Sequence, residues 1–295
     1  RRAMAKIGAD CPEYLSQFVV CGHEEATILA DNPKIALLCA TGSPAMARTM
    51  VGKTGMRMGR SLVALGGNNS AIITPEADID LAVRHLVKST IVDCGQRCTS
   101  LQRLFCHTDV YDTVMERLKN SLNLIYVNSP FERQTQIGPL IDKEAYNNMR
   151  LALDQAQNEG GKIFGGNRLM IGNYDNAYYV HPAVAEMPEQ TEIVKTELLA
   201  PVLFVMKYDN LHDAVEKINE VPQSLISCIF SNNVKETGYF SSIRGVKSNV
   251  ATVNAGSVGY DLVAMFGNRR NGGSSAAEPW RSYMQSKTCL VNYNF

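Results

Sequence analysis

The feature that most constrains the fold of this chain is the alternation of strand-like and helix-like segments along most of its 295 residues. Short apolar runs at 35–39, 70–74 and 103–107 are each followed by a longer segment whose apolar residues have helical spacing. This order is typical of a parallel sheet with helices packed on its faces. It predicts an α/β fold, and the chain shows no internal repeat or low-complexity tract that would suggest another architecture.

The same patterns predict where the individual elements lie. Proline at position 182 cannot donate to a sheet ladder, so the strand around it is expected at an edge. The terminal strand has no partner in the chain and is expected to need one. Strands are predicted at 17–21, 35–39, 61–65, 70–74, 103–107, 162–164, 178–184, 201–208, 225–230, 249–254 and 287–293, helices at 1–8, 23–30, 44–58, 78–92, 110–124, 142–158, 211–221 and 234–243, and a long loop at 256–278.

The composition excludes several classes of function. Twenty-nine basic and 29 acidic residues balance, so the chain lacks the basic signature of a nucleic-acid-binding protein. No apolar run reaches the roughly 18 residues of a membrane span. The eight cysteines form no Cys-x-x-Cys pair and the five histidines do not cluster, so no metal site is expected. Most cysteines lie in apolar strand-like runs, which predicts reduced thiols in an intracellular compartment.

Cys98 is the candidate nucleophile. It lies in the segment 93–100, between the helical run 81–92 and the strand-like run 104–107. At such a boundary a thiol can be partly exposed and backbone N–H groups can point at a substrate oxygen. The competing interpretation is a cysteine that acts only as a small apolar side chain. Cys94 could form a redox pair with Cys98, but we expect it to be a bystander.

A second candidate feature is the turn Thr41-Gly42-Ser43 before the predicted helix 44–58. Ser43 suits the N-cap of that helix, and Pro44 suits its first position. A strand, a glycine turn and a helix N-terminus together can place amides against the phosphate of a dinucleotide. On these residues alone, an ordinary capped helix is the better interpretation.

Two motifs give the chain a resemblance to a known family. The run Ala64-Leu65-Gly66-Gly67-Asn68-Asn69 and the later Gly95-Gln96-Arg97-Cys98-Thr99 together resemble the aldehyde dehydrogenase superfamily, and most closely its antiquitin-like, α-aminoadipic semialdehyde dehydrogenase-like branch. Positions 64 and 98 are 34 apart (98 − 64), which is the separation of general base and nucleophile in that family. Further landmarks follow in family order at 41–43, 137–140, 197–201 and 265–267.

The resemblance covers the C-terminal three-fifths of such a protein and implies its fold. It implies a remainder of the dinucleotide-binding domain at 1–64, a Rossmann-like parallel catalytic domain at 65–262, and a substrate-passage loop with an oligomerisation strand at 263–295. It also implies NAD as cofactor, and either a homo-oligomer or a hetero-oligomer formed through the C-terminal strand, alone or within a larger protein assembly. The compartment would be the mitochondrial matrix or the cytosol.

The resemblance also assigns roles to single residues. Cys98 would attack the aldehyde, and its own backbone N–H would supply half of the oxyanion site. In the family, an Asn that lies upstream of the position of Arg1 supplies the other half of the oxyanion site. Arg97 could meet the carboxylate of a semialdehyde acid, and Phe266 would line the substrate passage. The cofactor-binding positions would be Thr41, Gly42, Ser43, Leu65, Gly66, Glu197 and Leu199. Glu197 would accept a hydrogen bond from the nicotinamide ribose, and Leu199 replaces an aromatic residue of the family.

The main departure from the family is Ala64, which stands where the general-base Glu belongs. Pro44 and Ala47 also replace the usual Thr and Gly of the cofactor helix, and the glycine-rich motifs at 266–268 and 272–275 are altered. We therefore expect impaired catalysis and favour an inactive chain that serves as a structural or assembly subunit. The alternative is an active NAD(P)-dependent aldehyde or semialdehyde dehydrogenase that could pass its acyl group to coenzyme A.

Overall fold

The structure is a computed structural model that describes residue 6 and residues 14–170, 172, 174–221, 224–259 and 283–293. The chain forms two compact units. The smaller unit comprises Arg1–Ala40 and Ala45–Leu62, and the larger comprises Thr41–Pro44 and Val63–Phe295. The domain boundaries at 64/65 and 262/263 stay predictions.

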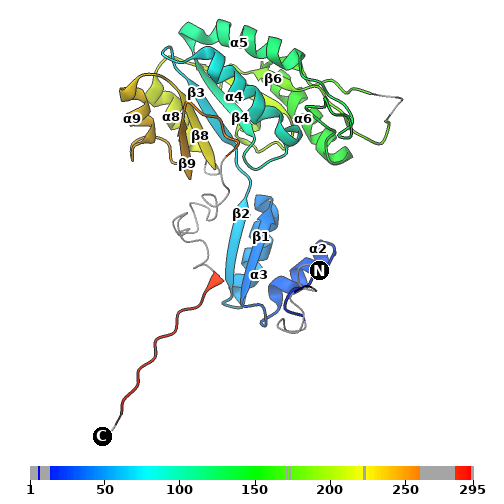
Figure 1. Cartoon of the computed structure of the whole chain (residues 1–295), viewed down its shortest axis with the longest axis vertical. Coiled ribbons are helices and arrows are strands. Elements are labelled where there is room, and N and C mark those ends of the chain that lie inside the picture. Colours follow the sequence, from blue (N-terminus) through cyan, green and yellow to red (C-terminus); the bar gives the residue numbers. More distant parts are fainter. Residues whose placement is uncertain are drawn as a thin grey trace. The chain divides into compact units, whose positions relative to one another are not determined.

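The smaller unit is built on helices α2 (His23–Asp31) and α3 (Pro44–Met56). Lys53 Nζ of α3 lies 2.6 Å from Asp31 Oδ2 at the end of α2. Arg57, just beyond α3, donates its Nε–H to the Ala30 carbonyl at 2.8 Å. These two contacts tie the C-terminal ends of the helices together. Strands β1 (Leu37–Gly42) and β2 (Arg60–Leu65) pair as a two-stranded sheet (Figure 1).

The larger unit contains a seven-stranded sheet of order β5-β6-β7-β4-β3-β8-β9. All neighbouring strands pair in parallel except β5 and β6, which are antiparallel. Helices pack against the sheet (Figure 1), with α4 and α5 side by side against its central strands. The elements are β3 (Asn69–Ile73), α4 (Ile79–Ile91), β4 (Leu101–His107), α5 (Thr108–Asn123), α6 (Lys143–Asn158), β5 (Lys162–Gly165), β6 (Ala183–Glu186), α7 (Glu192–Lys195), β7 (Val202–Tyr208), α8 (Leu211–Glu220), β8 (Ile226–Phe230), α9 (Val234–Ser241) and β9 (Val250–Val253).

The four central strands β7, β4, β3 and β8 are almost wholly buried, which explains their composition. A strand that is covered on both faces is apolar along its length rather than alternating. Because the four strands are parallel, their first residues lie along one edge of the sheet. The loops that precede Asn69, Leu101, Val202 and Ile226 therefore meet at that edge.

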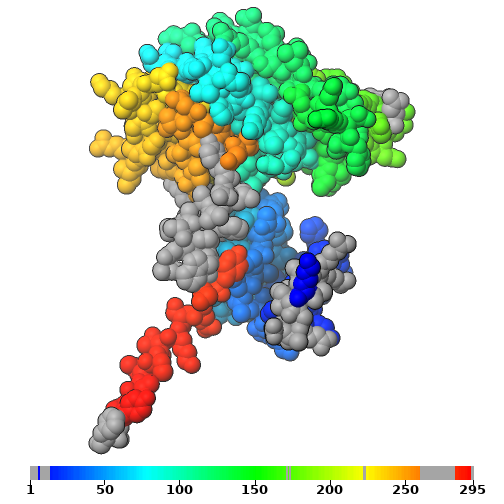
Figure 2. Space-filling view, in the orientation of Figure 1, coloured from blue at the N-terminus to red at the C-terminus, as the bar shows by residue number. Residues whose placement is uncertain are grey.

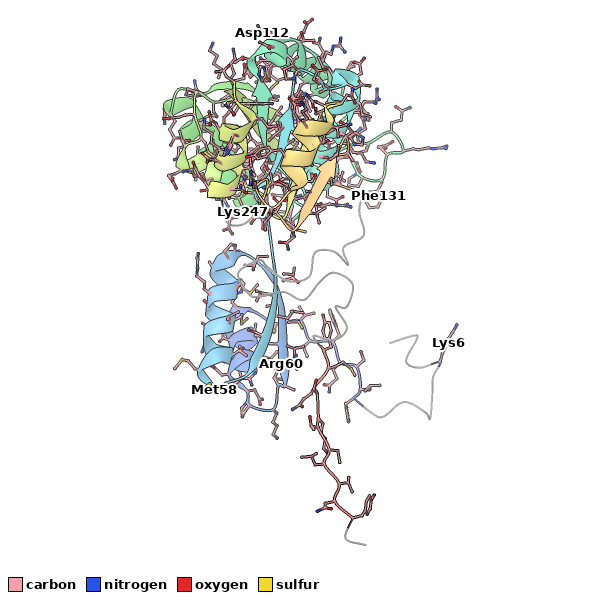
Figure 3. All side chains as sticks on the ribbon, turned by 90° about the vertical axis from the view of Figure 1, so that its left-hand side faces the viewer. Lys6, Met58, Arg60, Asp112, Phe131 and Lys247 are labelled. Atoms are coloured by element: carbon pink, nitrogen blue, oxygen red, sulfur yellow. The ribbon has the colours of Figure 1, made fainter. Side chains whose placement is uncertain are left out.

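The helices begin and pack as the sequence predicts. Asp78 and Asp142 cap α4 and α6, each accepting a hydrogen bond from the backbone N–H three residues ahead, at 2.9 and 2.8 Å. Helix α5 buries Val114, Leu118 and Leu122 completely on one face. Figure 3 shows the side chains that fill the larger unit, with the exposed Asp112, Phe131 and Lys247 labelled at its surface.

Most predicted elements are confirmed within a few residues, including the strand at 35–39, which begins at Leu37. Two predictions are wrong. No strand forms at 17–21, where the side chains are exposed. Strand β6 is shorter than the predicted 178–184 segment because the ladder begins after Pro182, with the Ala183 N–H donating to Pro201 O. It lies second from the edge of the sheet, because β5 pairs with its outer side.

Residues 287–293, red in Figure 2, are exposed and form no ladder within the described part of the chain. The strand expected there needs a second subunit as its partner, so it stays a prediction.

Some predictions fall on residues that are not described. The helix at 1–8 and most of the loop at 256–278 lie outside the described residues. Within the part of the chain that is described, no helix is both long enough and apolar enough to cross a membrane. The same residues contain no group of three His, Cys, Asp or Glu side chains that could hold a metal ion.

The packing of α5 gives a first prediction. Leu118→Ala should lower the free energy of unfolding by about 2–5 kcal/mol, because Leu118 is fully buried and its removal leaves a cavity. Leu124→Ala is the matched control: Leu124 is 82% exposed at the end of the same helix, so its loss should cost less than about 0.5 kcal/mol. Urea denaturation of both variants measures the difference, and equal losses would contradict the packing described here.

Candidate active site

A cavity of about 340 Å³ lies at the edge where the central strands begin. Its walls come from the last residues of β1 and β2, from Ser43, and from the loops before β3, β4, β7 and β8, all within the larger unit. The volume falls in the range of small-molecule sites. The lining residues are Thr41, Gly42, Ser43, Ala64, Leu65, Gly66, Gln96, Cys98, Glu197, Leu199 and Leu225.

The side chain of Asn69 holds three of these loops in place. Its Nδ2 donates to the carbonyls of Cys98 and Ser100 at 2.8 and 2.9 Å, and its Oδ1 accepts from the Ile226 N–H at 2.8 Å. Asn69 is completely buried, so these groups have no water to bind instead. Each bond contributes about 0.5–1.5 kcal/mol, and leaving one partner unpaired costs more.

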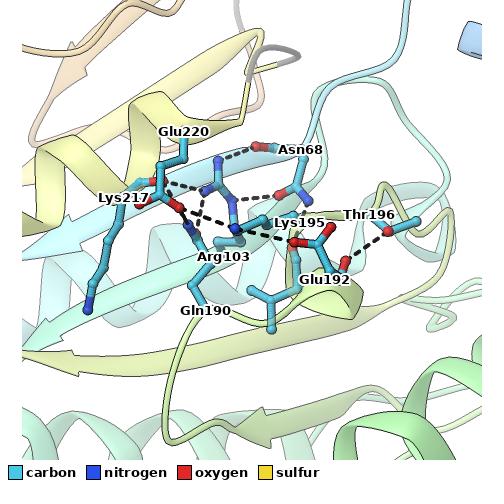
Figure 4. A network of polar contacts seen from close by, with 9 residues as sticks. Asn68, Arg103, Gln190, Glu192, Lys195, Thr196, Lys217 and Glu220 are labelled. Carbon is cyan, nitrogen blue, oxygen red and sulfur yellow. Dashed lines mark hydrogen bonds and ion pairs between the residues drawn. The ribbon is translucent and has the colours of Figure 1, made fainter.

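Two polar residues of β4 fix the neighbouring loops. Gln102 pairs with the backbone of Leu198 in both directions: its Nε2 donates to the carbonyl at 2.9 Å and its Oε1 accepts from the N–H at 3.0 Å. Arg103 donates to the side chain and the carbonyl of Asn68, at 2.7 and 2.9 Å, and to Gln190 at 2.8 Å (Figure 4). Burial lowers the pKa of Arg103 to about 9. The Glu197 loop and the 64–69 loop are thus both attached to β4.

The loop that carries Cys98 begins with a left-handed turn. Asp93, Cys94 and Gly95 have φ angles of 50°, 57° and 69°. Only glycine fits the third position, because a Cβ there would lie 2.3 Å from the Ala200 carbonyl oxygen. The turn therefore packs directly on the backbone of the Glu197 loop and brings the two segments into one wall.

Cys98 is half-buried and lines the cavity. Burial is the main cause that raises its pKa, and the nearby Glu197 carboxylate raises it further. The backbone N–H of Cys98 itself and the Arg97 guanidinium act in the opposite direction. This N–H lies close enough to the sulfur to affect the pKa of the thiol, and it is the donor that an oxyanion site at Cys98 would use.

Glu197 packs directly against Gly66. A Cβ on Gly66 would lie only 1.8 Å from Glu197 Oε1, so the close approach requires glycine. The Gly67 N–H donates to the carboxylate and lowers its pKa, but burial outweighs that effect and raises the pKa overall. Ala64 lines the same cavity and places only a methyl group there.

The structure brings together most, but not all, of the predicted site residues. Cys98, Ala64, Glu197 and all the predicted cofactor positions line the cavity. Arg97 does not: its side chain is exposed and forms an ion pair with Asp93. Phe266 lies outside the described residues. Cys94 is 2% exposed, and burial raises its pKa to about 12, which fits a bystander.

Sequence reasoning missed Asn69, Gln102 and Arg103 as residues that position the site. The available signal was their polarity inside otherwise apolar strands, since a buried polar side chain must find partners. It also missed a second, larger cavity of about 610 Å³ beside α6. Glu197, Gln96 and Leu199 line both cavities, but the second contains no cysteine.

Comparison with known proteins gives one family. The model described as "Aldehyde dehydrogenase family" matches residues 2–289. The chain is 33% identical over 269 residues to a putative aldehyde dehydrogenase family 7 member A1 homolog of Dictyostelium discoideum, covering 90% of this chain and 52% of that protein. It is 31% identical over 300 residues to the alpha-aminoadipic semialdehyde dehydrogenase of Rattus norvegicus, covering 99% and 55%. The chain thus spans about half the length of these relatives.

Solved structures show the same fold. Lactaldehyde dehydrogenase from Escherichia coli has a TM-score of 0.75 at 27% identity, over 80% of this chain and 49% of the other. A 3,6-anhydro-L-galactose dehydrogenase in complex with NAP has a TM-score of 0.85 at 23% identity, over 93% and 58%.

The environment of Cys98 predicts its reactivity. Iodoacetamide should modify Cys98 but leave the buried Cys94, Cys106 and Cys228 unmodified in the folded chain. Because the pKa of Cys98 is raised, its alkylation rate should still be rising with pH beyond the ordinary thiol pKa of about 8.5. Peptide mapping at several pH values measures both effects. Modification of Cys94 at the rate of Cys98 would contradict the burial described here.

Proposed function

Because the chain belongs to the aldehyde dehydrogenase family, we propose that its larger unit performs the acyl-forming half of aldehyde oxidation, with Cys98 as the nucleophile. The observation that carries the proposal is the cavity itself. Its lining includes the half-buried Cys98 together with the residues to which the resemblance assigns cofactor binding, and this supports the proposal. A cysteine with only a packing role would have no reason to face such a cavity.

The proposed reaction begins with the Cys98 thiolate attacking the aldehyde carbon. The Cys98 N–H donates to the aldehyde oxygen, which becomes negative. The covalent adduct on Cys98 is a thiohemiacetal. NAD(P), when bound, accepts the hydride from that carbon. The product held on Cys98 is a thioester.

The residues present fit the nicotinamide end of the cofactor. Thr41, Gly42 and Ser43 line a ligand-sized cavity together with Leu65 and Gly66, and the Glu197 carboxylate at its wall can accept from a ribose hydroxyl. Leu199 offers an apolar surface, without the stacking of an aromatic ring. Pro44 and Ala47 depart from the family at the phosphate end, so weaker cofactor binding is expected there.

Release of the acyl group is the step that Ala64 impairs. A methyl group cannot take a proton from water, and a general base typically contributes about 10²–10⁴ in rate. A chain of this kind would form the thioester faster than water removes it. Another thiol, such as that of coenzyme A, could then take the acyl group.

The second candidate function is a structural or assembly subunit without turnover. The observation in its favour is Ala64 together with the altered cofactor helix, since both lie outside the seven-stranded sheet. In that case oligomerisation through residues 287–293, which expose Leu290, Val291 and Tyr293, would be the retained role. We place either form in a reducing compartment, the mitochondrial matrix or the cytosol, because the described cysteines form no disulfides.

The substrate class is an aldehyde, and a semialdehyde is suggested only by the name of the Rattus norvegicus relative. Arg97, the predicted contact for a substrate carboxylate, is turned to solvent toward Asp93. The proposal therefore covers binding of the aldehyde group of the substrate, and not binding of a carboxylate elsewhere on the substrate.

Restoring the base separates the two candidates. Ala64→Glu should raise aldehyde-dependent NADH formation about 10²–10⁴-fold, because it supplies a carboxylate at the cavity wall. Ala64→Gln is the matched control, with the same size and no basic group. NADH absorbance measures turnover, and calorimetric titration with NAD measures binding.

The subunit interpretation predicts a different result. No NAD binding and no NADH formation in the native chain or in Ala64→Glu would favour a structural role and contradict the proposed acyl chemistry. Cys98→Ser should abolish NADH formation in either background.

A further inference from the structure

We propose that Glu197 is the proton acceptor for the water that hydrolyses the Cys98 thioester in this chain. The inference rests on the proposed acyl chemistry of Cys98. It assigns to Glu197 a role in addition to the predicted contact with a cofactor ribose. It would give the chain a slow hydrolytic release where the usual carboxylate at position 64 is missing.

The position of the Glu197 carboxylate supports this role. Glu197 and Cys98 line one cavity, together with the methyl group of Ala64. Among the described residues that line this cavity, Glu197 is the one carboxylate. Its Oε1 packs on Gly66, and the Gly67 N–H donates to it. The side chain is therefore held at the cavity wall by Gly66 and Gly67, which follow the end of β2 where position 64 lies.

A second route for water supports this role. Glu197 also lines the larger cavity beside α6, so water can reach this residue through either cavity. Gln96, which lines both cavities, is held by hydrogen bonds to the backbone of Asp93 and Ile141, at 3.0 and 2.9 Å. It can bind a water at this boundary without changing its own position.

The electrostatic environment of the Glu197 carboxylate also supports this role. Burial raises the pKa of Glu197, which makes the carboxylate a stronger base than an exposed one. The other titratable groups that face it are Cys98 in the first cavity and Asp142 and Glu144 of α6 in the second. Lys195 is two residues away in sequence, but its Nζ contacts Glu192 and Glu220, at 3.4 and 3.3 Å.

The proposed step balances without an oxidant. Water breaks one O–H bond, its proton goes to the Glu197 carboxylate, and its oxygen bonds to the thioester carbon. The carbonyl oxygen becomes an oxyanion that accepts from the Cys98 N–H. Collapse breaks the C–S bond and releases a carboxylic acid, and the proton on Glu197 returns to the Cys98 thiolate.

An activated ester tests this step without any cofactor. p-Nitrophenyl acetate acylates a reactive thiol directly, so a burst of p-nitrophenol measures acylation of Cys98 and the following steady rate measures hydrolysis. Glu197→Gln should keep the burst and lower the steady rate at least tenfold. The acetyl group should then persist on the Cys98 peptide in mass spectra. Glu192→Gln, which removes an exposed acid on the neighbouring α7, is the matched control and should leave both phases unchanged.

Two further readouts exclude a merely structural effect of the substitution. The steady rate of the native chain should rise with pH through an apparent pKa above the ordinary value of about 4.3 for Glu, and this dependence should disappear in Glu197→Gln. Adding Ala64→Glu to Glu197→Gln should restore hydrolysis, because it supplies a different carboxylate to the same cavity.

The possible failures are distinguishable. A native chain without a burst overturns the proposed acyl chemistry, and the role of Glu197 with it. A burst in the native chain followed by an unchanged steady rate in Glu197→Gln overturns only the role of Glu197.

Discussion

The side chain of Asn69 lies at the point where three loops of the site converge. By binding the carbonyls of Cys98 and Ser100 and the N–H of Ile226, it joins the starts of β3, β4 and β8. Parallel strands alone would bring these loops to one edge of the sheet, but not into a fixed register. The buried amide adds that register, since any displacement of the Cys98 loop would leave polar groups unpaired. Gln102 does the same for the Glu197 loop on the other side of β4.

This framework explains how the site can lose one carboxylate and stay formed. None of the hydrogen bonds that hold the loops involves the side chain at position 64, and the Glu197 carboxylate is held by Gly66 and Gly67. Replacing Glu with Ala there removes a charge and leaves the wall of the cavity intact. In the proposed mechanism, the chemistry then depends on Cys98 and on the half-buried Glu197 carboxylate, whose negative charge raises the pKa of the thiol.

The fold and the site differ in how far the sequence predicts them. The apolar runs of β3, β4, β7 and β8 and the acid caps of α4 and α6 are local signals, so those elements are predicted within a few residues. Residues 17–21 and 287–293 have strand-like composition, but a strand also needs a neighbour, and neither forms a ladder here. The family motifs predict Cys98 and Glu197 as site residues, and both line one cavity in the structure. The direction of Arg97 was not predictable, because its ion pair with Asp93 depends on the left-handed turn between them.

The claim on which this account depends is that the Cys98 sulfur and the Glu197 carboxylate, both half-buried, share one cavity. The most direct measurement is the thiol pKa of Cys98, obtained from thiolate absorbance or from the pH dependence of alkylation, in the native chain and in Glu197→Gln. The account predicts a lower pKa in the variant, because a negative charge that opposes the thiolate has been removed. An unchanged pKa would show that the two groups do not face each other and would contradict the site described here.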